Sequence, residues 1–208
     1  MEDVERFLSE RGLPTGGARS ARLEHYLELL LQFNEAMNLI GPMGRQEVID
    51  ELFIDSLVAA EARPPAGPIL DVGTGAGLPG LVLKIVYEEL PITLVEPRRK
   101  RATFLKIVTH RLGLSHVTIH NERIEDVHER DFDVVISKAF QPPLQWLETA
   151  RPFIASQGAV ICMARKHDRN ELEAKADELG LTLVRSAAGA GEGPEQRVTY
   201  AFEVPGQP

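Results

Sequence analysis

The stretch at 71–80, DVGTGAGLPG, combines glycines and an acid at spacings that suit the binding of a nucleoside-like ligand. Read from Gly73, it is G-x-G-x-G with Asp71 two places upstream, a pattern typical of turns that bind S-adenosylmethionine. Read from Gly75, it is G-x-G-x-x-G, which is typical of turns that bind NAD. In both cases backbone N–H groups of the turn can approach a ligand at the start of a helix. The glycines alone therefore leave both ligands open.

The acid at Asp71 favours the first of these two patterns. If Gly75 opened the turn, the strand before it would read ILDVGT, with an acid and a glycine inside a run that should be buried and apolar. Parsed from Gly73, the strand is PILDV, and Asp71 falls at its carboxyl end, where ligands of parallel sheets bind. A carboxylate there suits the positive sulfonium of S-adenosylmethionine and would repel the pyrophosphate of NAD. We therefore expect Asp71, Gly73, Gly75 and Gly77 to bind S-adenosylmethionine.

A second acid, Glu96, ends the run ITLVE, roughly 20 residues after the glycines. Acids at this distance bind ribose hydroxyls in both nicotinamide and adenosylmethionine folds, so Glu96 supports a nucleoside without distinguishing the two. The alternative role for Asp71 is a carboxylate that caps the following helix or turn. Because Glu96 and the glycines occur together, cofactor binding is the better interpretation.

After residue 68, short β-rich runs alternate with helical ones. The expected strands are 68–72, 92–96, 117–120, 132–137, 158–163, 181–186 and 198–204. The expected helices between them are 79–90, 98–112, 142–155 and 168–179, with a shorter one near 122–128. This alternation predicts an α/β fold with a parallel sheet covered by helices on both faces. The loop GAGEGPEQ leaves no room for a crossover helix, so the last two strands should pair antiparallel.

The first 60 residues or so have the apolar spacing of helices. Helices are expected at about 4–11, 20–37 and 46–60. The sequence RPPAGP at 63–68 then breaks the chain, because prolines cannot continue a helix. We therefore expect a helical N-terminal extension at 1–63 and a core domain at 64–208.

Length and composition indicate one sizeable core. At 208 residues, 43% hydrophobic and 26% charged, the chain is typical of an ordinary globular protein. The charged N-terminus lacks the apolar core of a signal sequence, and no apolar run reaches the ~18 residues of a membrane span, so we expect a cytoplasmic protein. The single cysteine, Cys162, and the spacing of the histidines match no zinc site, so we expect no metal.

The net charge of −8 by itself argues against a polyanionic partner such as nucleic acid. Its distribution qualifies that argument, because the segment 98–111, RRKRATFLKIVTHR, carries six Lys and Arg residues and no acid. The simplest interpretation of such a run is the solvent-exposed face of a helix. A basic surface that attracts RNA is the alternative, and its effect should weaken sharply with salt.

Five stretches, FNEAMNLI, LFIDSL, ILDVGTGAGLPG, RIED and VISKAF, resemble in their order and spacing the bacterial 16S ribosomal RNA guanine-N7 methyltransferases, once called glucose-inhibited division protein B. The resemblance covers roughly residues 20 to 200. It implies a class I, Rossmann-like methyltransferase core of seven strands and methylation of one guanine in the decoding-region loop, in 16S ribosomal RNA or the small ribosomal subunit. Carried over by position, it implies that Gly73, Leu78, Ile124 and Glu125 bind the cofactor.

Three cations should meet at the edge of the sheet where the cofactor binds. Lys138 follows the fourth expected strand, Arg165 follows the fifth, and Arg197 begins the last, antiparallel one. We expect all three to bind RNA phosphates, and Lys138 to contact the cofactor as well. Lys138 stands where the family usually has arginine, and an ammonium binds oxygens differently from a guanidinium. Glu51-Leu52 stands where the family often has an Arg-His pair.

The chemistry at guanine N7 needs no general base, because N7 of the neutral base has an in-plane lone pair that can attack a sulfonium methyl group. We therefore expect no catalytic Ser, Cys or His, and rate acceleration chiefly by alignment of the reacting atoms. Cys162 should be a small buried residue of a strand. Two other functions stay open on the residues alone: an NAD-dependent oxidoreductase, supported by GAGLPG, and a nucleic-acid-binding module without activity.

Overall fold

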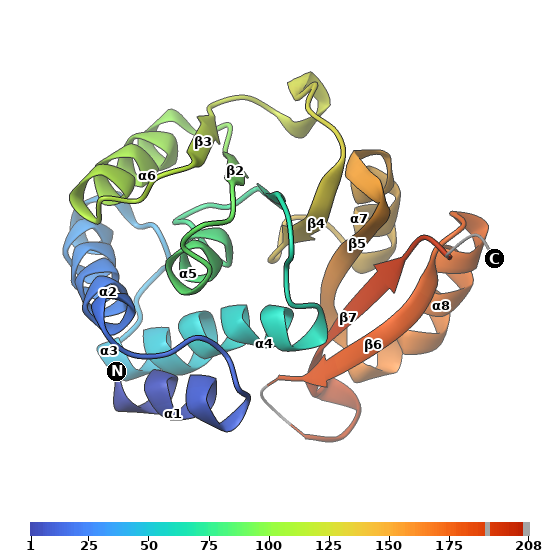
Figure 1. The fold of residues 1–208 in the computed structure, drawn as a ribbon, viewed down its shortest axis with the longest axis horizontal. Coiled ribbons are helices and arrows are strands. Elements are labelled where there is room, and N and C mark those ends of the chain that lie inside the picture. The colour runs from blue at the N-terminus through green and yellow to red at the C-terminus, as the bar shows by residue number, and fades with distance from the viewer. Residues whose placement is uncertain (190–191, 206–208) are drawn as a thin grey trace.

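A seven-stranded sheet lies at the centre of the molecule, in the strand order β3-β2-β1-β4-β5-β7-β6 (Figure 1). The computed structural model describes residues 1–189 and 192–205. The strands are β1 (Ile69–Val72), β2 (Ile92–Val95), β3 (Val117–His120), β4 (Phe132–Ser137), β5 (Ile154–Arg165), β6 (Thr182–Ala188) and β7 (Arg197–Glu203). β1 to β5 pair in parallel, and β7 is antiparallel to both β5 and β6. The predicted α/β sheet with an antiparallel end is confirmed.

Helices cover both faces of the sheet, because alternate residues of each strand point to opposite sides. In β1, for example, Ile69 packs in one apolar cluster and Leu70 in the other. The first face is covered by α4, α5 and α6, and the second by α7 and α8 (Figure 1). These helices are α4 (Asp55–Ala62), α5 (Gly80–Val86), α6 (Arg99–Arg111), α7 (Pro143–Ala150) and α8 (Arg169–Glu178).

Two helices end earlier than predicted, and local chemistry explains both. The helix expected at 142–155 ends at Ala150, and a 3-10 turn leads into β5 at Ile154. Pro152 in that turn lacks the N–H that a longer helix needs, so the chain leaves the helix and joins the sheet. The helix expected at 79–90 ends at Val86. The residues after it form a turn, which Lys84 holds by donating from Nζ to Leu90 O (2.8 Å).

The N-terminal segment is helical, as expected. It contains α1 (Glu2–Glu10), α2 (Ala18–Met37), α3 (Arg45–Val48), a π-helical turn (Ile49–Ile54) and α4. The helix expected at 46–60 is therefore present, but its middle is widened by the π turn. Such wide turns occur frequently at functional sites, and this one lies directly before Asp55.

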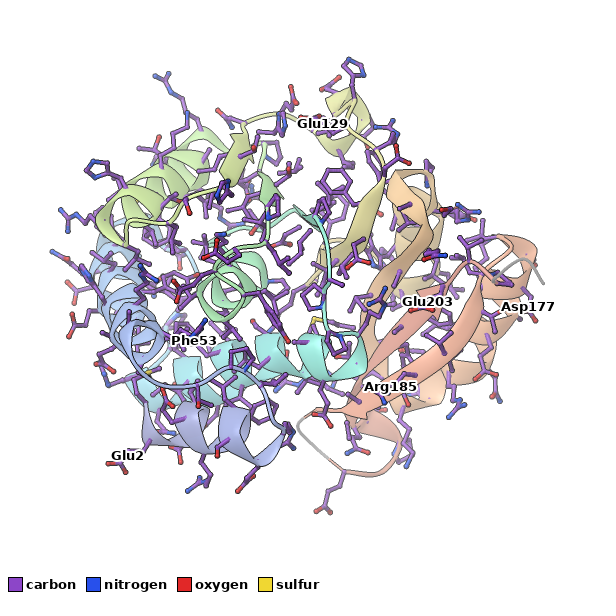
Figure 2. The ribbon with its side chains drawn as sticks, viewed as in Figure 1. Glu2, Phe53, Glu129, Asp177, Arg185 and Glu203 are labelled. Carbon is purple, nitrogen blue, oxygen red and sulfur yellow. The ribbon has the colours of Figure 1, made fainter. Side chains whose placement is uncertain are left out.

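The N-terminal helices pack into the same apolar core as the first face of the sheet. Tyr26 of α2 stacks on Phe53 with 5.2 Å between ring centroids, and its hydroxyl donates to Ala76 O in the glycine turn (2.8 Å). At the expected domain boundary, Arg63 pairs with Glu203 of β7 (2.7 Å). Figure 2 labels Phe53 and Glu203, which lie in the N-terminal and C-terminal parts of the molecule. The boundary near residue 63 stays a prediction, since one core spans it.

Candidate functional site

The glycine turn after β1 holds three residues with positive φ: Gly73 (+67°), Gly75 (+61°) and Gly77 (+99°). A Cβ at Gly73 would lie 2.5 Å from the Phe140 ring, and a Cβ at Gly77 would lie 2.4 Å from Leu81. Both distances are impossible for real atoms, so these two positions require glycine. A Cβ at Gly75 would meet its nearest side-chain atom at 3.6 Å, an ordinary contact. At Gly75 it is therefore the positive φ, rather than crowding, that favours glycine.

Asp71 is fully buried beneath this turn. Its Oδ2 accepts hydrogen bonds from Thr74 Oγ1 (2.5 Å) and from Gly80 N at the start of α5 (2.8 Å). Its Oδ1 is buried and makes no hydrogen bond to the residues that the structure describes. Burial raises the pKa of Asp71 to about 7, although the bonds from Thr74 and Gly80 oppose that rise. Asp71 thus ties the turn to the helix, as the capping alternative predicts, while its second oxygen stays without a protein partner.

Glu96 follows β2 directly and is held by the same turn. Its side chain is only 3% exposed, and its two oxygens accept hydrogen bonds from Gly75 N (3.0 Å) and Arg98 N (2.8 Å). A guanidinium nitrogen of Arg101 lies 3.9 Å away. Asn121, after β3, donates to the backbone oxygen of Glu96 (2.9 Å). The carboxylate is therefore fixed in place, and a carboxylate has about four lone-pair sites, so it keeps some for ligand hydroxyls.

The other positions expected to bind the cofactor lie around this edge of the sheet. Ile124, in a short 3-10 turn after β3, belongs to the same apolar cluster as Val72 and Val95, which end β1 and β2. Glu125 beside it is exposed, whereas Leu78 in the glycine turn is buried. The structure thus brings Ile124 to the ends of β1 and β2. Contact of these residues with a cofactor stays a prediction.

A pocket of about 390 Å³ opens at the carboxyl ends of β4 and β5, beside the start of β7. Trp146 of α7 forms an apolar wall and meets Phe140 edge-on, with 6.2 Å between ring centroids. Phe140 in turn packs against Gly73. The pocket therefore adjoins the glycine turn, and two aromatic rings lie between them. The charged residues that line it are Asp55, Lys138, Arg165, Asp168 and Arg197.

Asp55, at the start of α4, lies beside two of these cations. It was not among the site residues predicted from the sequence. Its side chain is 4% exposed and lies 2.7 Å from Lys138 Nζ and 3.9 Å from a guanidinium nitrogen of Arg197. Lys138 Nζ also donates to Glu51 O (2.7 Å), and the Glu51 carboxylate lies 3.8 Å from Arg197. Burial lowers the pKa of Lys138, and the nearby Asp55 carboxylate opposes that change. We call Glu51, Asp55, Lys138 and Arg197 the Asp55 cluster.

Arg165 lies directly opposite Arg197 in the antiparallel ladder of β5 and β7. Its guanidinium donates to Glu195 O (2.8 Å), and its side chain is otherwise exposed. Like charges facing each other across a ladder repel, and the acids of the pocket offset that repulsion. The structure therefore brings Lys138, Arg165 and Arg197 to one pocket, as expected. Their contact with RNA stays a prediction.

Comparison with known proteins decides between the two ligands. A family model described as rRNA small subunit methyltransferase G (GidB) matches residues 19–194. This chain belongs to that family. The ribosomal RNA small subunit methyltransferase G of Wolinella succinogenes is 36% identical to this methyltransferase over 183 residues, which cover 88% of this chain and 93% of the relative. The protein of that name from Halorhodospira halophila is 34% identical and covers 82% of this chain and 83% of its own.

Solved structures show that this methyltransferase has the class I fold. A SAM-dependent O-methyltransferase of Thermotoga maritima has a TM-score of 0.59 at 17% identity, over 88% of this chain and 72% of its own. TYW2 of M. jannaschii, solved in complex with AdoMet, has a TM-score of 0.55 at 17% identity, over 66% of this chain and 68% of its own. Identities this low support the likeness of fold alone.

This methyltransferase uses S-adenosylmethionine, and the residues of its glycine turn fit that cofactor. The buried Oδ1 of Asp71, unpartnered among the residues described, can accept from or pair with a cationic group. Glu96 offers fixed acceptor sites of the kind that ribose hydroxyls need. The family does not favour the NAD-dependent oxidoreductase or the module without activity.

The site supports neither a cysteine nucleophile nor a metal centre among the residues described. Cys162 lines the pocket but is 1% exposed, and burial raises the pKa of its thiol, so the prediction that it is a buried strand residue is confirmed. Within 1–189 and 192–205, no group of three His, Cys, Asp or Glu side chains is placed to hold a metal ion. Of the helices that the structure describes, none combines the length and apolar character needed to cross a bilayer.

Sequence reasoning missed two residues of the site, Asp55 and Phe140. Asp55 interrupts the run LFIDSLVAA, which is otherwise apolar apart from a serine, and a single acid in such a run indicates a buried charge that needs a partner. That signal was available from the sequence. Phe140 gave no comparable signal, because its contact with Gly73 depends on how the chain turns after β4.

Proposed function

We propose that this methyltransferase transfers a methyl group from S-adenosylmethionine to N7 of a guanine in 16S ribosomal RNA. The observation that carries the proposal is the pocket beside the glycine turn. The half-buried ring of Phe140, between the pocket and the turn, offers a surface for a flat base displaced from the RNA, because protein sites for single-stranded bases commonly stack them on aromatic rings. The names of the relatives support small-subunit ribosomal RNA as the substrate.

The charge balance of the pocket supports methylation of a neutral base. The bound cofactor supplies a methyl group carried on a positively charged sulfur. When a neutral guanine accepts that group at N7, positive charge develops on the base. Lys138, Arg165 and Arg197 alone would oppose this change, whereas Asp55 and Asp168 offset most of their charge. A pocket whose cations are largely offset therefore fits this reaction better than a strongly basic one.

The residues of the pocket need to hold and align the base, since no proton leaves N7 before the attack. Phe140, which packs against the buried Trp146, offers a flat apolar surface beside the turn. Lys138, Arg165 and Arg197 supply donors for oxygens of the base or of the adjoining phosphates. Because alignment by itself can supply a large part of a rate acceleration, no catalytic Ser, Cys or His is required.

We extend the proposal to the partner and the location. The substrate is 16S ribosomal RNA, either free or in the assembling small subunit, and the reaction takes place in the cytoplasm, where ribosomal subunits assemble. The family assignment supports both statements.

The test is to incubate the protein with labelled S-adenosylmethionine and either 16S ribosomal RNA or small ribosomal subunits, and then to map the label. We expect one labelled guanine, modified at N7, detected by chain cleavage specific for N7-methylguanine. Label at another atom or in another RNA would contradict the proposal. So would tight binding of NAD without binding of S-adenosylmethionine.

A further inference from the structure

Helix α6 carries a row of exposed cations, which we call the α6 cation face: Arg99, Lys100, Lys106 and Arg111. Within residues 1–189 and 192–205, none of their side chains forms an ion pair or a side-chain hydrogen bond. By contrast, many other cations of the molecule, such as Arg22, Arg45 and Arg63, are paired with acids. The positive charges of the α6 cation face are therefore available to bind an anionic partner, although the net charge of the chain is −8.

The helix holds these cations outward, because its other side is fixed in the core. Ala102, Phe104, Leu105 and Val108 are buried against the sheet and α2. The exposed cations recur on the opposite side, and from Lys100 to Arg111 they extend over about 16 Å of helix. Figure 1 shows α6 at the β3 end of the sheet, with α2 beside it. The face is thus a rigid, elongated basic surface.

A shallow groove of about 440 Å³ runs between α2 and α6 next to these cations. Half-buried Phe33 and Ile107 give it an apolar floor, and Lys106, His110 and Arg111 line its rim. Phe33 is held by Phe104, with 5.5 Å between ring centroids. An apolar floor with cations on the rim suits a nucleotide, whose base is flat and whose phosphate is negative.

Like charges on one helix repel, so this surface does not stabilise the free protein. A polyanion would remove that repulsion. The pocket beside the glycine turn has less charge available for phosphates, because two of its three cations, Lys138 and Arg197, already lie against Glu51 and Asp55. We propose that the α6 cation face binds phosphates of a segment of the substrate RNA away from the target guanine. This proposal rests on the proposed function for the identity of the RNA.

The distance between the α6 cation face and the pocket determines which part of the RNA the α6 cation face can bind. α6 connects β2 to β3, whereas the pocket lies at β4, β5 and β7. Three to four strand spacings separate them, about 15–19 Å. The segment on α6 is therefore several nucleotides from the methylated base along the strand, or belongs to a neighbouring strand of the folded RNA.

The test compares two double variants that lose the same charge. Lys106→Ala with Arg111→Ala changes the α6 cation face, and Arg6→Ala with Lys175→Ala changes ion-paired residues on α1 and α8. Binding to a 16S ribosomal RNA transcript is measured by fluorescence anisotropy over a range of salt concentrations. For the α6 variant we expect about 10-fold weaker binding and a log–log salt slope smaller by about 1.4 to 1.8. The control should match the unmutated protein.

Two further measurements separate possible outcomes. Affinity for S-adenosylmethionine should be unchanged in the α6 variant, and that result would also show that the variant is folded. If the variant does not fold, the double variant Arg99→Ala with Lys100→Ala replaces it. Unchanged RNA affinity and salt slope in the α6 variants would overturn the inference, as would an equal loss in the control. Binding of the α6 face to vesicles of anionic lipid, without an effect on RNA, would also overturn it. Because binding is measured directly, absence of methylation by the unmutated protein would count only against the proposed function.

Discussion

Two basic regions of the molecule differ in whether their cations are paired with acids. In the Asp55 cluster, Lys138 and Arg197 are partly buried and lie against acids, of which Asp55 is buried. On the α6 cation face, the cations are exposed and unpaired among the residues described. A buried cation needs an acid beside it, because leaving it alone costs several kcal/mol, whereas an exposed cation is solvated by water. The difference indicates a division of work: the cluster positions groups, and the α6 cation face attracts RNA.

The largest effect is expected when the acid of the cluster is removed. Asp55→Ala leaves Lys138 buried without its partner, so we expect about 3–5 kcal/mol of lost stability. Methylation should fall roughly 100-fold or more, because misplaced residues at a reacting centre cost about that much. Chemical denaturation and methyl transfer to RNA measure the two effects. Glu61→Ala is the control: Glu61 also lies on α4, but its pair with Arg11 is exposed and should contribute less than about 1 kcal/mol.

A double variant separates stability from positioning in the same cluster. In Asp55→Asn with Lys138→Met, neither member of the buried pair is charged, so most of the lost stability should return. Methylation should stay low, since the Lys138 cation is absent and Arg197 has lost the Asp55 carboxylate beside it. Full recovery of methylation in the double variant would show that the cluster acts on stability alone.

A smaller effect is expected at the cofactor side of the pocket. Glu96→Ala removes a charged acceptor that the turn holds in place, and affinity for S-adenosylmethionine should fall by about 1.5–3 kcal/mol. Calorimetry measures the affinity, and Glu122→Ala, an acid that pairs with His120 further along the chain, is the control. Normal affinity in Glu96→Ala would exclude Glu96 from the cofactor site.

The comparison of the two basic regions also predicts two kinds of kinetic change. Arg197→Glu should lower the methylation rate about 10-fold, because a charge-assisted contact to an oxygen of the base is replaced by repulsion. Its salt slope should stay close to that of the unmutated enzyme, whereas variants of the α6 cation face should change the slope and leave the rate at saturating RNA unchanged. Rates measured at several salt concentrations distinguish the two. If Arg197→Glu also flattened the salt dependence, the division of work between the regions would be wrong.

The smallest expected effect is a pH dependence of cofactor binding at Asp71. Its pKa is raised to about 7 by burial, so the free protein binds a proton there at pH 6 and has lost most of it at pH 8. A cationic ligand favours the ionised carboxylate, so binding should release a proton, and affinity should increase up to about 10-fold between pH 6 and pH 8. Calorimetry with Asp71→Asn in parallel corrects for titration of the ligand. An equal increase in the variant would place the cationic group elsewhere.

Sequence reasoning found the parts of the site that depend on local pattern. The glycines, Asp71 and Glu96 lie at the ends of strands whose apolar runs are easily read, and the parallel order of those strands brings them together. Arg165 and Arg197 were placed at one edge by the antiparallel pairing alone, which the ladder confirms. The Asp55 cluster was not found, because it depends on a contact between segments 87 residues apart in the chain.

The bond from the Tyr26 hydroxyl to Ala76 O means that the segment before residue 63 cannot simply be cut away. A truncated chain that began at β1 would lose the stacked rings of Tyr26 and Phe53, the hydroxyl that donates to the glycine turn, and the helix that carries Asp55. Limited proteolysis in the segment 63–68 should therefore yield two pieces that stay associated, rather than a free catalytic fragment. Fusion partners are better attached at the chain ends than inserted between the helices and the sheet.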